Sequence, residues 1–153
     1  VWMTNPTTVS SAFGLARMLM REGQVSLALR ALDKVPNASR HSRMAQLTAI
    51  LCLVAGQPTE AQIRLAARRL EQIPSTEPRF LQIKVSVIEA GLTHLREHGS
   101  AGPAPLFEYP FTMRELRRGL AHTLRAQARI APYPRHRYAL VDMANKVRPA
   151  TWF

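Results

Sequence analysis

Two histidines are the residues in this chain best spaced for metal chemistry. His94 and His98 are four residues apart, which places both imidazoles on one face of a helix. A zinc site needs three or four ligands, and no third or fourth ligand is evident at a matching spacing. The pair therefore predicts solvated histidines near a helix C-terminus, where the helix dipole favours the protonated ring, and no metal site.

Nucleophilic chemistry has equally little support in the sequence. Ser, His and Asp residues are present, but only Asp33 and Asp142 supply the acid, and no nucleophile-bearing turn is recognisable. Cys52 is the single cysteine, so it forms no intrachain disulfide, and its place in a predicted helix is that of a small core residue. We expect a chain without catalytic residues or cofactors, in a reducing cytoplasm.

Arginine is the third residue type with chemical potential, since 21 Lys and Arg against 10 Asp and Glu give a net charge of +11. Two groups lie on predicted helix faces where they could follow a phosphate backbone: Arg64, Arg68 and Arg69, then Arg114, Arg117, Arg118, Arg125 and Arg129. Aromatic residues for base stacking are not interleaved with them. A basic helical repeat that binds nucleic acid is therefore the alternative, and solvated faces or docking surfaces for an acidic protein are favoured.

The elements that must position these residues are helices. Hydrophobic residues make up 46% of the 153 residues and return at three- and four-residue spacings, which predicts one all-α domain with a sizeable core. The longest apolar run, 49–55, is too short to span a membrane. Caps and breakers predict hairpins over about 6–36, 38–74 and 76–130, an insertion at 98–110, and a terminal helix at 135–147 whose Tyr138, Val141 and Met143 cover the end.

An internal repeat organises these helices. A shift of about 33 residues superposes the first two hairpins. It pairs Ala16 with Ala49, Gly23 with Gly56, Ala28 with Ala61, and Leu32 with Leu65. Small residues at helix crossings and glycine at the turn are typical of tetratricopeptide repeats, so a short solenoid of about seven helices is favoured over a generic helical bundle. Gly91 is the expected crossing residue of the third hairpin.

Such a solenoid holds a polypeptide in the concave groove lined by the first helix of each hairpin, or dimerises through an end or edge. The repeat register predicts groove positions at Ser10, Phe13, Arg17, Met20 and Arg21 in the first hairpin and at Arg43, Gln46, Ile50, Leu53 and Val54 in the second. This mixture of arginine and aliphatic residues suits an acidic, partly apolar segment of a partner protein.

Five segments closely resemble one known family. They are SAFGLAR (11–17), ALDKVPNASRH (31–41), AARRLEQIPSTEPR (66–79), YPFT (109–112) and RHRYALVDMANKVRP (135–149). Together they resemble the C-terminal region of the actinobacterial serine/threonine-protein kinase G, over nearly the whole chain. The insertion at 101–105 departs from the family pattern.

The resemblance implies a longer parent with a rubredoxin-like iron domain and an ATP-dependent kinase domain. Neither domain's motifs occur here, because Cys52 stands alone and the glycine-rich loop, His-Arg-Asp and Asp-Phe-Gly are absent. ATP and iron are thus expected only in other parts of the parent. The resemblance also implies a homodimer, and contacts with the parent's kinase domain or with its forkhead-associated-domain substrates. The implied location is the cytoplasm, with secretion of the parent in some members left open.

Overall fold

The computed structural model describes residues 6–131 and 134–147, and these residues form seven α-helices. The helices are α1 (Pro6–Arg21), α2 (Val25–Asp33), α3 (Ser42–Val54), α4 (Glu60–Glu71), α5 (Phe80–His98), α6 (Met113–Ile130) and α7 (Pro134–Val147). Within this part of the chain the β-structure amounts to an isolated bridge between Leu106 and Tyr109. The predicted all-α, tetratricopeptide-like fold is confirmed.

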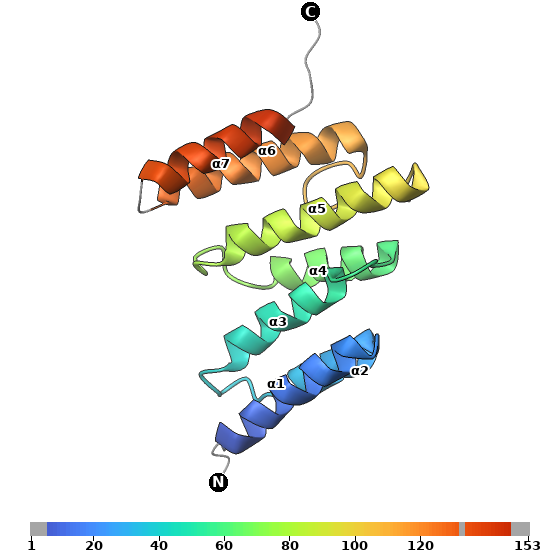
Figure 1. Cartoon of the computed structure of the whole chain (residues 1–153), viewed down its shortest axis with the longest axis vertical. Coiled ribbons are helices and arrows are strands. Elements are labelled where there is room, and N and C mark those ends of the chain that lie inside the picture. Colours follow the sequence, from blue (N-terminus) through green and yellow to red (C-terminus); the bar gives the residue numbers. More distant parts are fainter. Residues whose placement is uncertain (1–5, 132–133, 148–153) are drawn as a thin grey trace, which may run out of the picture.

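The helices pair as consecutive hairpins stacked in one direction (Figure 1). α1 packs on α2, α3 on α4 and α5 on α6, and α7 lies along α6. Hairpins are joined by contacts of α2 with α3 and of α4 with α5, and α3 also contacts α5. The first hairpin and α7 lie at opposite ends of the stack (Figure 1). Each hairpin therefore buries its faces against its neighbours in the sequence.

The turn glycines of the first two hairpins have the predicted role. Gly23 has φ +74° and Gly56 has φ +67°, a left-handed conformation that costs glycine little. At the first turn the Gly23 amide donates to the Met20 carbonyl and the Gln24 amide donates to the Leu19 carbonyl, at 3.1 and 2.8 Å. These two bonds close α1 with a Schellman motif, which satisfies its last carbonyls.

The repeat register holds in the first helices of the two hairpins and breaks in the second. Ala16 and Ala49 are both buried at crossings. Ala61 is exposed, however, and Ile63 is the buried residue of α4 near that position. The pairing of Ala28 with Ala61 was therefore wrong, because α2 begins two residues after its turn glycine and α4 begins four residues after its own.

The capping box predicted at the start of α4 is confirmed. The Gln62 amide donates to Thr59 Oγ1 at 3.2 Å, and the Thr59 amide donates to Gln62 Oε1 at 2.9 Å. The two side chains satisfy amides that have no partner inside the helix. α4 is therefore fixed at its first turn by its own sequence.

Two helices begin later than the sequence predicts. α3 begins at Ser42 and α5 at Phe80, each about four residues after the expected start. Short turns occupy the preceding residues, as when the Glu77 amide donates to the Pro74 carbonyl and the Phe80 amide donates to the Glu77 carbonyl. The Glu77 carboxylate also accepts from the Arg79 side chain at 3.0 Å. These turns use the backbone groups that an earlier helix start would need.

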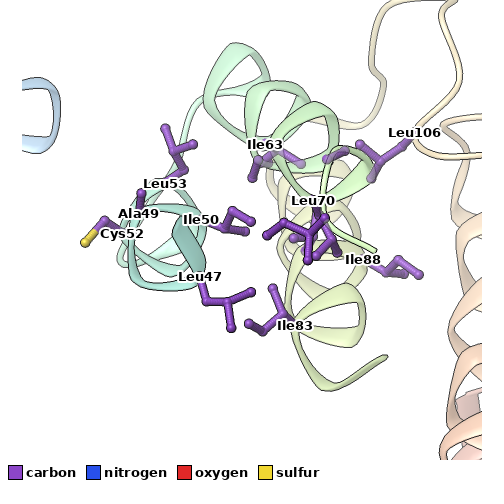
Figure 2. Packing of buried hydrophobic residues seen from close by; sticks show 14 of the residues in the cluster. Leu47, Ala49, Ile50, Cys52, Leu53, Ile63, Leu70, Ile83, Ile88 and Leu106 are labelled. Carbon is purple, nitrogen blue, oxygen red and sulfur yellow. The ribbon is translucent and has the colours of Figure 1, made fainter. Parts of the chain in front are cut away.

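The central core lies where α3, α4 and α5 meet (Figure 2). Ile50 of α3, Ile63 of α4 and Ile88 of α5 are all fully buried. Gly91 lets α5 and α6 approach closely, because a β-carbon there would lie 3.0 Å from Leu116 Cδ1. The predicted crossing residue of the third hairpin is thus found at the crossing.

The insertion between α5 and α6 packs on α4 through Arg64, one of the arginines expected to be solvated. The Arg64 guanidinium donates to the carbonyls of Gly102, Ala104 and Pro105 at 3.0, 2.8 and 3.2 Å. It also donates to Glu60 Oε2 at 2.9 Å, and its side chain is only 15% exposed. The expectation was therefore wrong for Arg64, which holds the inserted loop against the solenoid.

The terminal helix α7 packs on α6, and Val141, one of its three predicted covering residues, is half-buried. Ala144 is fully buried, and Leu140 and Val147 pack against the core. Met143 is 45% exposed, so its predicted covering role was wrong, and the Tyr138 side chain lies outside the described residues. A hydrogen bond also joins the end of α7 to α6, because Arg117 Nε donates to the Val147 carbonyl at 3.1 Å.

Candidate functional site

An open groove separates α1 from α3. Its volume is about 480 Å³, within the range of known ligand sites. Its lining from α1 is Phe13, Ala16, Arg17 and Met20, and its lining from α3 is Met44, Thr48, Leu51, Cys52 and Ala55. α3 contacts α4 and α5 on one side, and its contacts with the first hairpin are chiefly with α2. The lining is mostly apolar and accessible from solvent.

The groove exists because the first hairpin is stacked differently from the second. In the repeat register, Phe13, Arg17 and Met20 of α1 correspond to Gln46, Ile50 and Leu53 of α3. In α3, Ile50 and Leu53 are 0% and 2% exposed and face the following helices (Figure 2). In α1, the corresponding positions face an opening in place of a packed helix. Repeat positions that are buried between helices in one hairpin therefore line an open groove in the other.

The predicted groove residues of the second hairpin lie away from this groove. Leu53 is 2% exposed and packs in the core, whereas Ile50, although 0% exposed, lines a separate hollow between α2, α3 and α4 together with Gln46. The binding role of Ile50 and Gln46 stays a prediction. Gln46 is exposed on another side of α3, where its Oε1 accepts from Arg43 Nε at 3.1 Å. The groove side of α3 carries Met44 and Leu51 instead, roughly a third to half a turn away around the helix.

The predicted residues of the first hairpin lie closer to the groove. Phe13, Arg17 and Met20 are part of its lining, whereas Arg21 is exposed at the end of α1 beyond it. Their role in binding stays a prediction.

The sequence does contain a signal for Met44 and Leu51, which the repeat register did not place in the groove. α3 is apolar on nearly all sides, so it carries a second apolar stripe, Met44 and Leu51, besides the one that enters the core. These two side chains are 43% and 42% exposed, and Leu15, Met18 and Leu27 of the first hairpin are similarly exposed. Clustered exposure of large apolar side chains is typical of protein-binding surfaces.

Cations surround this apolar floor. The groove continues along α1 into a hollow lined by Phe13, Arg17, Arg40 and His41 among others. On the α3 side, the Arg79 guanidinium lies 3.3 Å from the Met44 sulfur. Arg17 and Arg40 are exposed, so their charges face solvent at the edge of the groove. The edge is therefore cationic.

The acid nearest this edge is already engaged by two arginines. Glu77 accepts from Arg79 Nε at 3.0 Å and from Arg43 Nη1 at 3.2 Å, and its side chain is 7% exposed. Burial opposes ionisation of Glu77, but the hydrogen bonds from Arg79 and Arg43 outweigh burial and hold its pKa below the ordinary value. Glu77 therefore stays ionised and partners these arginines within the fold.

The remaining candidate chemical groups have structural surroundings. Burial raises the pKa of the Cys52 thiol, so at neutral pH Cys52 adds an apolar surface to the groove floor. His94 is not solvated as expected, because its side chain is 10% exposed and stacks on His98 with ring centroids 4.3 Å apart. His94 Nε2 lies 3.8 Å from Glu60 Oε1. In the part of the chain that the structure describes, no three His, Cys, Asp or Glu side chains lie close enough together to bind a metal ion.

The family of the chain follows from its match to known sequences. Residues 1–151 match the family described as the protein kinase G tetratricopeptide repeat. The chain belongs to this family. The sequence resemblance to the kinase G C-terminal region is thus confirmed, and tetratricopeptide domains are protein-interaction modules.

Two curated relatives place this kinase G tetratricopeptide-repeat chain within longer proteins. It is 48% identical to the serine/threonine-protein kinase PknG of Mycobacterium leprae and 44% identical to the protein of the same name from Mycolicibacterium smegmatis. The matches cover 99% and 100% of this chain but only 20% of each relative. The similarity is therefore to one region of a kinase. Across the described residues, none of the helices is both long and apolar enough to cross a bilayer.

Proposed function

We propose that this chain is a non-catalytic protein-binding region of a serine/threonine-protein kinase G, and that the groove between α1 and α3 holds a segment of its partner. The observation that carries the proposal is the open apolar floor of Leu51, Met44 and Phe13 beside the exposed arginines Arg17 and Arg40. Burying exposed Leu51 and Met44 would favour binding by about 25 cal/mol per Å² of apolar area.

The charge at the groove edge selects the chemistry of the segment. An aliphatic or aromatic side chain of the partner would enter between α1 and α3, and flanking acidic residues would pair with Arg17 and Arg40. Arginine suits this role because its planar fork pairs with carboxylates through two parallel hydrogen bonds. Exposed pairs of this kind add modest affinity and mainly set orientation and association rate.

Three partners are consistent with this region's place in a kinase. They are a second copy of the chain in a homodimer, the catalytic domain of the same kinase, and a forkhead-associated-domain substrate. The proposed site of action is the cytoplasm. Support for this set comes from the family membership, and from relatives that are named as serine/threonine kinases and are about five times longer than this chain.

The test is binding of each partner to groove variants. Light scattering over a wide concentration range measures self-association, and calorimetry measures binding of a kinase G catalytic domain and of a forkhead-associated-domain protein. Leu51→Glu and Arg17→Glu should each weaken the contact about tenfold or more, since one introduces charge into the floor and the other reverses charge at the edge. Leu51 is 42% exposed, so Leu51→Glu should still fold.

A matched control is Arg30→Glu, which makes the same charge reversal at an exposed position of α2 outside the groove lining. It should bind like the unaltered chain. A chain that stays monomeric and binds neither protein would overturn the proposal. Equal weakening by Arg17→Glu and Arg30→Glu would also overturn it, because net charge and not the groove would then control binding.

A further inference from the structure

A stripe of basic residues, four arginines and one histidine, runs along the outer face of α6 in the third hairpin. Its members are Arg114, Arg118, His122, Arg125 and Arg129, which we call the α6 stripe. At 100° per residue these five positions fall within an arc of about 80°. They span about four turns, or roughly 20 Å, of the helix surface.

The fold does not account for most of this stripe. α6 buries its opposite side against α5 and α7 through residues such as Leu116, Leu120 and Leu124. Arg117, which lies off the stripe, has a structural contact with the Val147 carbonyl at 3.1 Å. Arg114 and Arg129 are exposed and have no acidic partner among the described residues.

The other arginines of the stripe have limited internal contacts. Arg118 reaches Glu115 Oε2 at 3.5 Å with its side chain still 55% exposed. Arg125 Nη2 donates to Asn145 Oδ1 at 3.0 Å, which orients the guanidinium and leaves its other donors available. Like charges three and four residues apart repel one another on an isolated helix. The stripe is therefore a surface that an anionic partner would stabilise.

The spacing of the stripe indicates the form of that partner. Arginines at positions i, i+4, i+11 and i+15 follow one face of the helix with little drift, and carboxylates on one face of a second helix can repeat at the same intervals. Packed helices lie about 8–10 Å apart, a distance that long arginine side chains can bridge. Each guanidinium fork also matches a carboxylate.

Nucleic acid fits this surface less well. Single strands bind on platforms of stacked aromatic rings, and the stripe contains none besides the His122 imidazole. Reading a duplex groove usually requires a helix that projects from its domain, and α6 is packed between α5 and α7. We propose that the α6 stripe is a second docking surface, and that it binds an acidic amphipathic helix of a protein partner.

The test uses the 153-residue chain and a helical alanine-based peptide of about four turns with one glutamate per turn, matched to the stripe. Fluorescence anisotropy at low and physiological salt should show saturable binding that weakens as salt rises. The same peptide with glutamine in place of glutamate should bind at least about tenfold more weakly, because the charge-assisted hydrogen bonds are lost.

Charge-matched variants locate the site. Arg114→Glu, Arg118→Glu and Arg129→Glu together should weaken peptide binding by more than tenfold. The control combines Arg30→Glu, Arg68→Glu and Arg96→Glu, which changes the net charge equally at exposed positions of α2, α4 and α5 and should retain binding. If the stripe triple variant fails to fold by circular dichroism, the three arginines are replaced by glutamine and the same comparison applies.

Three outcomes would overturn the proposal: no binding of the glutamate peptide, equal weakening in the stripe and control variants, or tighter stripe-dependent binding of a single-stranded or duplex oligonucleotide than of the peptide. The last result would assign the stripe to nucleic acid. Leu51→Glu should leave peptide binding unchanged, because the groove lies between α1 and α3. The α6 stripe and the groove can therefore fail independently.

Discussion

Replacing Arg64 tests how the inserted loop is held. The Arg64 guanidinium joins α4 to the loop through three carbonyls and pairs with Glu60, whose carboxylate also accepts the Gly102 amide at 3.2 Å. Arg64→Ala removes these contacts together. It also removes the cation that lies 4.9 Å from the Phe111 ring centroid. Arg64→Ala should therefore free the loop and lower the stability of the whole chain.

The expected magnitude follows from the contacts that are lost. Each hydrogen bond to a carbonyl contributes a net ~0.5–1.5 kcal/mol, and the partial exposure of these three bonds places them in the lower part of that range, about 0.5–1 kcal/mol each. Three such bonds give a loss of about 1.5–3 kcal/mol in the free energy of unfolding. In a chain of this length the loss corresponds to a fall in Tm of roughly 3–12 °C. Arg64→Lys should lose about half as much, because a single ammonium cannot reach all of the carbonyls.

Urea unfolding followed by circular dichroism measures the free energy, and amide hydrogen exchange measures opening of the loop. Arg68→Ala is the control, because Arg68 is exposed on the same helix and should change stability by less than about 0.5 kcal/mol. Faster exchange in Arg64→Ala should include the Gly102 amide. If Arg64→Ala unfolds within about 0.5 kcal/mol of Arg68→Ala, the loop is not held by these bonds and the reasoning is refuted.

Three further predictions concern packing and pH. Gly119→Ala should lower the free energy of unfolding in urea by about 1–3 kcal/mol, because the new β-carbon would lie 2.6 Å from the Tyr109 ring. Gly14→Ala is the control: its β-carbon would meet nothing within 4 Å, so the change should be neutral or slightly stabilising. Ile50→Ala should lower the free energy of unfolding by about 2–5 kcal/mol and Leu51→Ala by less than about 1 kcal/mol, because Ile50 is fully buried and Leu51 is 42% exposed. Equal losses in the two variants would contradict the orientation of α3. The pKa of Glu77 in the folded chain lies below the ordinary 4.5. The ionised Glu77 therefore contributes to the free energy of unfolding above pH 4.5, and this contribution is lost as pH falls through the folded pKa. Urea titrations of Glu77→Gln across acidic pH should therefore show a shallower fall in stability than the unaltered chain, and parallel curves would contradict this assignment.

The sequence predicted most successfully what depends on local chemistry. Gly23 and Gly56 mark turns because their backbone needs positive φ, and Thr59 with Gln62 marks a helix start because both groups cap amides. These signals involve residues a few positions apart, so spacing alone reveals them. The helix count and the fold class followed from the same local patterns.

Properties that depend on how hairpins stack were not accessible in this way. The repeat assigned Leu53 to a groove because the equivalent Met20 was assigned there, but Met20 lines the opening between α1 and α3 whereas Leu53 is buried in the core. Spacing also could not show that Arg64 reaches carbonyls about forty residues away in the chain. Arg64 and Arg114 look alike in the sequence, and long-range contacts alone distinguish a structural cation from a free one.

The weak contact between α1 and α3 has a consequence for cooperativity. In a stacked array the stability of each unit includes the interface with its neighbour, and the first hairpin joins the rest chiefly through α2. Its local opening should therefore require less free energy than opening of α5, which is enclosed by α3, α4 and α6. A partner bound between α1 and α3 would supply the missing interface and raise the free energy of that opening by RT ln(1 + [L]/Kd). Occupancy of the groove would then be measurable as slower amide exchange in α1 and α2.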